Sequence, residues 1–391
     1  MDLDRTYVVP SYRRYPLELV CGRGSEVTDR DGRVYIDLGS GLAVNTLGFS
    51  DPAWCEAVTA QLTTLQHSSN LYFTKPAAQL AEQLCLRSGM KKVFFSNSGA
   101  EANECAIKAA RKYAELHYPG QRDLIVTLRN SFHGRTLATL AATGQSSFHQ
   151  EFLPLTPGFE SCEPSIEHVC NIVEKGQVAA FLIEIVQGEG GVVVLDPAFV
   201  RQLASLAAEN DILLIADEVQ TGAGRTGKLF AYMHTGITPD IVSTAKGLSG
   251  GLPLGATLFG EKTADVLGPG SHGSTFGGNP VAAAGALHVL SRLDDDLLHE
   301  VESKSAYIRD TLSSARGIIA VTGIGLMIGI KTVRPAALVI DACREAGVIV
   351  LQAKDRIRLL PALNIPWPLL KKAIRVVADA ADETGKAASG V

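Results

Sequence analysis

The sequence lacks several patterns that would each assign a chain to a functional class. Its seven cysteines are scattered without a CxxC pair, and its nine histidines form no HExxH motif, so neither a disulfide framework nor a zinc site is expected. Basic runs are scarce and the formal net charge is -5, which disfavours nucleic acid as the main partner. No apolar stretch has the length of a membrane span, and the N-terminus does not resemble a signal peptide. Because the seven cysteines are unpaired in the sequence pattern, we expect reduced thiols and therefore a cytoplasmic protein. We also expect no membrane association and no bound metal.

The 391 residues are too many for one typical core, so two closely associated domains are predicted. We divide the chain into an N-terminal arm that forms part of the small domain (1–45), a large domain (46–280) and a small C-terminal domain (281–391). In the large domain, short apolar runs alternate with helical patterns, which is typical of a mostly parallel sheet flanked by helices. The predicted class is therefore α/β, followed by a smaller α+β domain. The predicted strands of the large domain are 92–95, 123–128, 179–186, 211–216, 240–244 and 256–259, and its clearest helices are 101–114 and 197–208.

Three glycine-rich motifs do not have the sequence context that their usual functions require. Gly222, Gly224 and Gly227 match GxGxxG, but no clear helix pattern follows, as a dinucleotide site demands. The same stretch resembles a P-loop, yet Leu229 stands where a magnesium-binding hydroxyl is needed. Ser249 lies in a GxSxG pattern whose following glycines and proline oppose the helix of a nucleophile elbow. All three are interpreted as loops.

Two apolar strands end in residues that suit pyridine-cofactor chemistry. Asp217 follows the run 211–216, at the carboxyl end of a strand, where open α/β sheets bind ligands. A carboxylate there can keep a pyridine nitrogen protonated, although an aspartate at a strand end can also simply cap a turn. Lys246 follows the run 240–244, and a buried lysine can act as nucleophile and base, whereas most lysines at strand ends are merely solvated.

Two further segments suit a phosphate group. Small residues at 96–100 precede a helix, whose first N–H groups bind anions; Ser98 is also a good helix cap. Ser274 and Thr275 form a hydroxyl pair beside glycines, which could equally be an ordinary turn. Each signal is modest alone, but together they supply a lysine, an anion and a phosphate cradle in one α/β domain.

These motifs, in this order, resemble those of the fold-type I, class III aminotransferases that depend on pyridoxal 5'-phosphate, and most closely the acetylornithine aminotransferases. The resemblance covers nearly the whole chain. It includes GLAVNTLGFSDP (41–52), HSSNLYF (67–73), SNSGAEANE (96–104), SFHGRTLATLAATGQ (131–145), QGEGGV (187–192), DEVQTGAGRTG (217–227), AKGLSGGLPLGA (245–256), HGSTFGGNP (272–280) and RLLPAL (358–363).

The resemblance implies a role for each matching residue. Lys246 would bind the cofactor covalently and shuttle a proton, and Asp217 would pair with the pyridine nitrogen. Arg135, with Ser274 nearby, would bind the substrate α-carboxylate through its guanidinium fork. Arg358 would bind a second carboxylate or turn to Glu189. The cofactor site would comprise Ser98, Gly99, Ala100, Phe132, Asp217, Val219, Gln220, Lys246 and, from the other subunit of a homodimer, Thr275.

The implied reaction is transfer of the δ-amino group of N-acetylornithine to 2-oxoglutarate, a step of arginine biosynthesis. Ornithine, succinylornithine, succinyldiaminopimelate and 4-aminobutyrate are alternative substrates, and a catalytically silent binding protein is the alternative from another class. Two positions depart from the family pattern, since Ile185 and Ala362 stand where proline is more usual. Neither departure removes a catalytic group.

Overall fold

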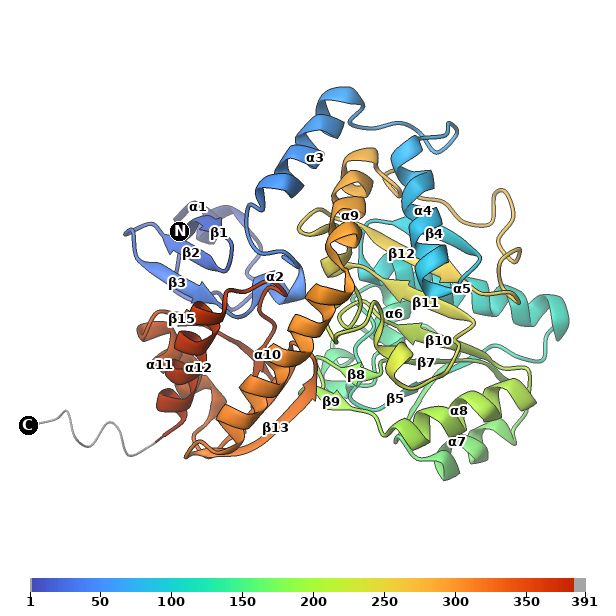
Figure 1. The fold of residues 1–391 in the computed structure, drawn as a ribbon. Coiled ribbons are helices and arrows are strands. Elements are labelled where there is room, and N and C mark those ends of the chain that lie inside the picture. The colour runs from blue at the N-terminus through green and yellow to red at the C-terminus, as the bar shows by residue number, and fades with distance from the viewer. Residues whose placement is uncertain (1, 383–391) are drawn as a thin grey trace, which may run out of the picture.

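The computed structural model describes residues 2–382. Within this part of the chain, no helix is both long and apolar enough to span a bilayer. Figure 1 shows a large sheet with its helices and, beside it, a smaller region in which the first and last elements of the chain lie together.

The central sheet has seven strands, in the order β4-β12-β11-β10-β7-β5-β6. Every pair is parallel except the two that β12 makes with β4 and β11, so the predicted mostly parallel α/β sheet is confirmed. Strand β6 was not predicted, because its sequence FESC alternates polar and apolar residues at the edge of the sheet. The strands are β4 (Lys92–Ser96), β5 (Leu124–Leu128), β6 (Phe159–Cys162), β7 (Val178–Ile183), β10 (Leu213–Asp217), β11 (Ile241–Thr244) and β12 (Gly255–Phe259).

Both faces of this sheet are covered, which explains why its inner strands are largely apolar. Along β10, Leu213 and Ile215 join the core cluster that contains the buried face of α5. Leu214 and Ala216 join the cluster on the opposite face, which includes α8. Helices α3 and α4 pack against α9 at one end of the sheet. The helices are α3 (Pro52–Thr64), α4 (Lys75–Ser88), α5 (Gly99–His117), α6 (Leu137–Ala142), α7 (Ile166–Val173), α8 (Pro197–Glu209) and α9 (Pro280–Arg292).

The helices begin at recognisable signals. Asp196 accepts the backbone N–H of Ala198 before α8, and Asn279 accepts that of Val281 before α9. In both helices proline occupies the first position, where its missing N–H costs nothing. These caps set the starts of elements that pack around the sheet.

The smaller region contains two further sheets. One is antiparallel, in the order β13-β14-β17-β16, and the other has the order β1-β2-β3-β15, so strands of the N-terminal arm pair with a strand near the C-terminus. The helical pattern of the sequence at 369–383 corresponds to α12, and position 383 lies outside the described residues. The elements are α1 (Asp2–Tyr7), β1 (Leu19–Arg23), β2 (Glu26–Asp29), β3 (Val34–Asp37), α2 (Ser40–Ala43), α10 (Asp295–Ser313), β13 (Ile318–Ile324), β14 (Met327–Thr332), α11 (Ala336–Glu345), β15 (Val348–Ile349), β16 (Leu351–Ala353), β17 (Arg356–Leu359) and α12 (Trp367–Ala381).

Short elements lie in the loops that follow the strands of the large sheet. They are the pair β8 (Val186–Gln187) and β9 (Val193–Val194), and the 3-10 helices η1 (Ser146–Phe148), η2 (Ala231–His234) and η3 (Lys246–Ser249).

Candidate active site

The central sheet brings the predicted lysine and aspartate to the same edge. Strands β10 and β11 are parallel neighbours, with Asp217 paired in register with Ser243. Lys246 follows two residues after β11 ends. The carboxyl ends of parallel strands meet at one edge of a sheet, which is where open α/β folds bind ligands.

Asp217 is almost fully buried and its carboxylate is held on both oxygens. Oδ1 accepts the backbone N–H of Val219 at 3.0 Å, and Oδ2 accepts the Asn103 side-chain amide at 2.8 Å. Oδ2 also lies 2.7 Å from Nδ1 of His133, whose Nε2 is buried without a partner among the described residues. The hydroxyl of Ser243 donates to Asn103 in turn. The carboxylate is therefore fixed in orientation before any ligand arrives.

Lys246 is half-buried in a tight turn at the start of η3. Its φ is 44°, a left-handed conformation that non-glycine residues adopt rarely. The next residue, Gly247, is tethered because its carbonyl accepts the hydroxyl of Thr46 at 2.8 Å. Burial lowers the pKa of the Lys246 ammonium below its usual value, although the nearby carboxylate of Glu189 opposes this shift. A lowered pKa makes more of the neutral amine available as a nucleophile.

The segment predicted to hold a phosphate forms the start of α5. Ser98 caps this helix, with its hydroxyl accepting the backbone N–H of Glu101. The first N–H groups of a helix have no partner within it, so those of Gly99 and Ala100 are free to meet an anion. A Cβ on Gly99 would lie 2.4 Å from Cγ1 of Val219, so glycine is required for this close approach.

Arg358 and Glu189 are paired, as the resemblance implies. Nη1 of Arg358 donates to Glu189 Oε1 at 2.5 Å and to Gln220 Oε1 at 3.1 Å, and the arginine is only 2% exposed. Its Nε is buried without a hydrogen-bond partner among the described residues. Burial alone would raise the pKa of Glu189, but Arg358 and Lys246 outweigh it and leave that pKa below its usual value. Gln220 therefore contacts this pair, a contact that the sequence did not predict.

Glu184 was missed as a site residue. Its buried carboxylate accepts the backbone N–H groups of Phe132 at 2.8 Å and Gly188 at 3.2 Å, so it joins the two loops that carry Phe132 and Glu189. Burial raises its pKa well above the usual value, and Asp217 adds to the shift. The departure at Ile185 leaves a side chain that is fully packed in the core.

The remaining predicted residues are not all brought together within one chain. Arg135 is exposed beside Phe132, with its guanidinium 5.6 Å from that ring. Ser274 hydrogen-bonds to Asn97 and to the backbone of Gly277 rather than to Arg135. Thr275 is exposed.

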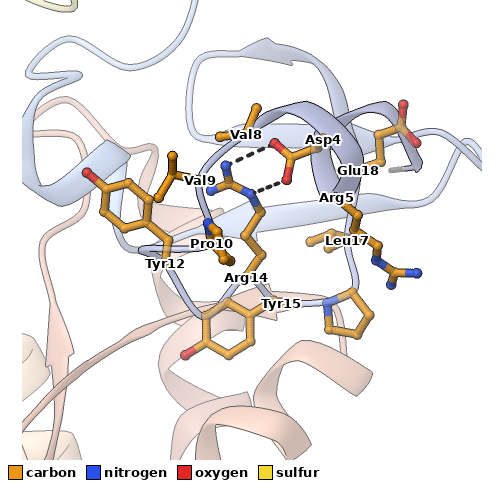
Figure 2. Close-up of a pocket in the computed structure, with 11 residues that line it drawn as sticks. Asp4, Arg5, Val8, Val9, Pro10, Tyr12, Arg14, Tyr15, Leu17 and Glu18 are labelled. Atoms are coloured by element: carbon orange, nitrogen blue, oxygen red, sulfur yellow. Dashed lines mark hydrogen bonds and ion pairs between the residues drawn. The ribbon is translucent and has the colours of Figure 1, made fainter.

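A cavity of about 540 Å³ lies elsewhere, between residues of the N-terminal arm (Figure 2). Arg14 pairs with Asp4 there at 2.7 Å and 2.9 Å, and the lining residues lie between positions 4 and 18. None of the predicted site residues lines this cavity, so we place the candidate site at Lys246 instead.

The donor set around Lys246 fits pyridoxal phosphate. A buried amine, a fixed carboxylate and the open start of α5 match the three functional parts of that molecule, namely its aldehyde, its ring nitrogen and its phosphate.

Comparisons with known proteins agree with this geometry. The family model for class-III aminotransferases matches residues 7–380. An acetylornithine aminotransferase of Haemophilus ducreyi is 48% identical, and the match covers 98% of each chain. The structure of N-acetylornithine aminotransferase from Stenotrophomonas maltophilia has a TM-score of 0.84 at 34% identity, covering 97% of both chains.

A structure of ornithine aminotransferase from Toxoplasma gondii, with PLP at partial occupancy in its active site, has a TM-score of 0.92 at 31% identity and covers 97% of this chain and 93% of that one. The chain therefore belongs to the class-III aminotransferases and is an aminotransferase that depends on pyridoxal 5'-phosphate.

Proposed function

We propose that the protein transfers the δ-amino group of N-acetylornithine to 2-oxoglutarate, giving N-acetylglutamate semialdehyde and glutamate. The observation that carries this proposal is the pairing of buried Arg358 with partly exposed Glu189 beside Lys246. N-Acetylornithine brings one carboxylate to the site, whereas 2-oxoglutarate brings two. A second cation is therefore needed in one half-reaction and must be neutralised in the other, because an unpaired buried charge costs several kcal/mol. Similarity to acetylornithine aminotransferases over the full chain supports the same substrate.

When bound, the cofactor supplies an electron-withdrawing ring that stabilises negative charge at the substrate carbon. Lys246 would hold the cofactor at its aldehyde and would move a proton at the reacting carbon of the substrate. Its pKa is lowered by burial, which favours both tasks because more of the amine is neutral than for a solvated lysine. Asp217, fixed by Asn103 and His133, would hold the proton on the ring nitrogen.

We assign the remaining cofactor contacts as follows. Gly99 and Ala100 would donate backbone N–H groups to the phosphate, and Ser98 would add its hydroxyl. Phe132 and Val219 would pack against the ring. The packing of Val219 against Gly99 supports its place next to the phosphate cradle. Gln220 would bind near the ring hydroxyl, and it also contacts the Arg358–Glu189 pair.

We infer that the active form is a homodimer in which Thr275 of each subunit completes the phosphate site of the other, with Ser274 beside it. Thr275 is exposed, and its neighbour Ser274 contacts Asn97 in the phosphate segment of its own chain, so the Thr275 side chain is open to a partner subunit. Large apolar side chains are exposed next to Thr275, at Phe276, and in the loop 65–73. Phe73 is fully exposed and Leu71 is 87% exposed, which is unusual for residues that face water. Phe73→Asp should yield monomers by sedimentation and weaken cofactor retention, whereas Leu338→Asp, at an exposed position on α11, should leave the dimer intact.

We also retain the division into an arm (1–45), a large domain (46–280) and a small domain (281–391). Pairing of β3 with β15 supports assigning the arm partly to the small domain. The start of α9 at Pro280 supports the boundary.

Steady-state rates with 2-oxoglutarate and either N-acetylornithine or ornithine test the substrate. We expect kcat/KM to be much larger for N-acetylornithine. A preference for free ornithine would instead assign the protein the activity of the structurally similar Toxoplasma enzyme.

A further inference from the structure

The contacts of Arg135 are with aromatic rings rather than with acids. Its guanidinium carbon lies 4.2 Å from the centroid of the Phe148 ring and 5.6 Å from that of Phe132. The two rings meet edge to face, 5.7 Å apart at 71°. Within residues 2–382, Arg135 makes no ion pair, so its charge is not neutralised by the described part of the chain.

Phe148 is itself fixed relative to Arg135. It is the last residue of η1, and the residues on both sides bind back to the segment that carries Arg135. The side-chain amide of Gln145 donates to the carbonyl of Ser131 at 3.1 Å. On the other side, Nε2 of His149 donates to the carbonyl of Leu140 at 2.9 Å. The ring is therefore a fixed surface beneath the guanidinium.

A ring is a suitable support for an arginine that must bind a carboxylate. The cation–π contact restrains the plane of the guanidinium without using its N–H groups. All five donors stay available, and the fork can bind both oxygens of a carboxylate. An acidic neighbour would also restrain the arginine, but it would compete with the substrate for the same donors.

We propose that Phe148 is a positioning residue that seats Arg135 for the substrate α-carboxylate. This inference rests on the proposed function, in which Arg135 binds that group. Phe148 does not contact the reacting atoms. It acts through Arg135, so its loss should weaken the binding of carboxylate substrates more than it slows the chemical step.

The test compares Phe148→Leu, which removes the ring, with Phe148→Tyr, which keeps it. For Phe148→Leu, KM for both N-acetylornithine and 2-oxoglutarate should rise about fivefold, because an exposed cation–π contact contributes about 1 kcal/mol. The value of kcat should stay within about twofold. Phe148→Tyr should have both KM values close to those of the wild type. Calorimetry with glutarate, a dicarboxylate that cannot react, should show the same loss of affinity in the holoenzyme.

A matched pair of amino donors isolates the carboxylate. N-Acetyl-1,4-diaminobutane is N-acetylornithine without its α-carboxylate. Phe148→Leu should leave kcat/KM for this amine unchanged while lowering it for N-acetylornithine. Equal losses with both donors would overturn the proposal. So would a matching loss of cofactor affinity, which would mean that Phe148 acts through Phe132 instead.

The results would differ if the proposed function, rather than the role of Phe148, were wrong. In that case the wild-type enzyme would not use N-acetylornithine. The KM for 2-oxoglutarate with another amino donor, and the glutarate affinity, would still decide the role of Phe148. A wild-type glutarate affinity in Phe148→Leu would refute it.

Discussion

Two groups of buried charge differ in what neutralises them. Around Lys246, charged side chains face one another: Glu189 pairs with Arg358, and both shift the pKa of the lysine. The second group is bound by backbone. Arg225 donates to the carbonyls of Leu326 and Pro361, at 3.1 Å and 2.5 Å.

Two more residues belong to the second group. Buried Lys304 donates to the carbonyl of Leu363 at 2.8 Å, although Glu300 also lies 3.0 Å away. Glu218 accepts the backbone N–H groups of Ala231 and Tyr232, both at 2.8 Å. Backbone groups cannot exchange partners without unfolding, whereas side-chain charges can. The first group can therefore respond to a ligand, and the second can only fix positions.

The two groups meet at one segment. Arg358 lies at the end of β17, and Arg225 and Lys304 hold the carbonyls of Pro361 and Leu363, a few residues later. Arg225 and Lys304 thus fix the position of the segment that follows Arg358, and so the position of Arg358 relative to the site. This comparison leads to five predictions, which separate effects on activity from effects on stability.

Removing the amine of Lys246 should have the largest effect. Lys246→Ala should lower kcat by about 10³-fold or more, because both the covalent attachment and the proton transfer depend on this amine. Its free energy of unfolding should not fall, since burial of the ammonium is a cost. After borohydride reduction, mass spectrometry should find the cofactor on the Lys246 peptide. Lys91→Ala, at an exposed ion pair, is the control. An adduct on any other lysine would refute the assignment.

Neutralising Asp217 should have the next largest effect. Asp217→Asn keeps the shape of the side chain but removes the charge that holds the proton on the ring nitrogen. We expect kcat to fall about 10²-fold and cofactor to bind more weakly, because a fixed charge in a dry site is worth a few kcal/mol. Single-turnover absorbance measurements would locate the loss at the proton-transfer step. A rate close to that of the wild type would mean that Asp217 only caps a turn.

These two residues could be predicted from the sequence, and their partners could not. Apolar runs that end at Asp217 and just before Lys246 mark the carboxyl ends of neighbouring strands. The partners come from distant segments: Asn103 is 114 residues from Asp217, and its contact depends on how α5 packs on the sheet. A polar residue on the otherwise apolar buried face of α5 was the available signal for Asn103.

Other parts of the site had even less signal in the sequence. Glu184 sits at the end of a buried strand, but its two backbone contacts follow from the path of two loops. The edge strand β6 has no apolar run, and the antiparallel direction of β12 depends on the loop before it. In physical terms, the positions of the strands along the chain follow from hydrophobic pattern, whereas polar contacts between loops depend on tertiary packing.

The third prediction concerns the second group of charges. Arg225→Met leaves two buried carbonyls without donors, so the free energy of unfolding should fall by about 2 kcal/mol. The rates of the two half-reactions should fall together if they fall at all, because Arg225 contacts neither ligand. Urea denaturation and single-turnover kinetics measure the two effects. A selective loss of the 2-oxoglutarate half-reaction would contradict the division into two groups.

The fourth prediction concerns the pair in the first group. Glu189→Gln leaves Arg358 without a negative partner when N-acetylornithine binds, so that half-reaction should slow about tenfold more than the other. Arg358→Ala should do the opposite and raise KM mainly for 2-oxoglutarate. Single-turnover kinetics of each half-reaction gives both ratios. If each variant slows the two half-reactions equally, the Arg358–Glu189 pair is structural and belongs in the same group as Arg225.

The smallest effect is expected from Glu218, the anion of the second group, and it depends on pH. Burial raises the pKa of Glu218 to about 7, from an ordinary value of 4.5. Between these values the folded protein holds a proton that the unfolded chain has lost, so the contribution of Glu218 to stability falls as pH rises. A glutamine carries no charge at any pH.

The stability deficit of Glu218→Gln relative to the wild type should therefore shrink between pH 5 and pH 8, because only the wild type bears the growing cost of a buried charge. Other buried acids, such as Glu184, titrate in both proteins and cancel in the difference. Urea unfolding across this range measures the deficit, and Glu209→Gln, at an exposed position on α8, should show none. A deficit that stays constant with pH would mean that backbone N–H groups keep Glu218 ionised throughout. Backbone N–H groups would then stabilise a buried carboxylate as well as a side-chain cation does. The two groups would still differ in whether their partners can change when a ligand binds, but not in how well the charge is stabilised.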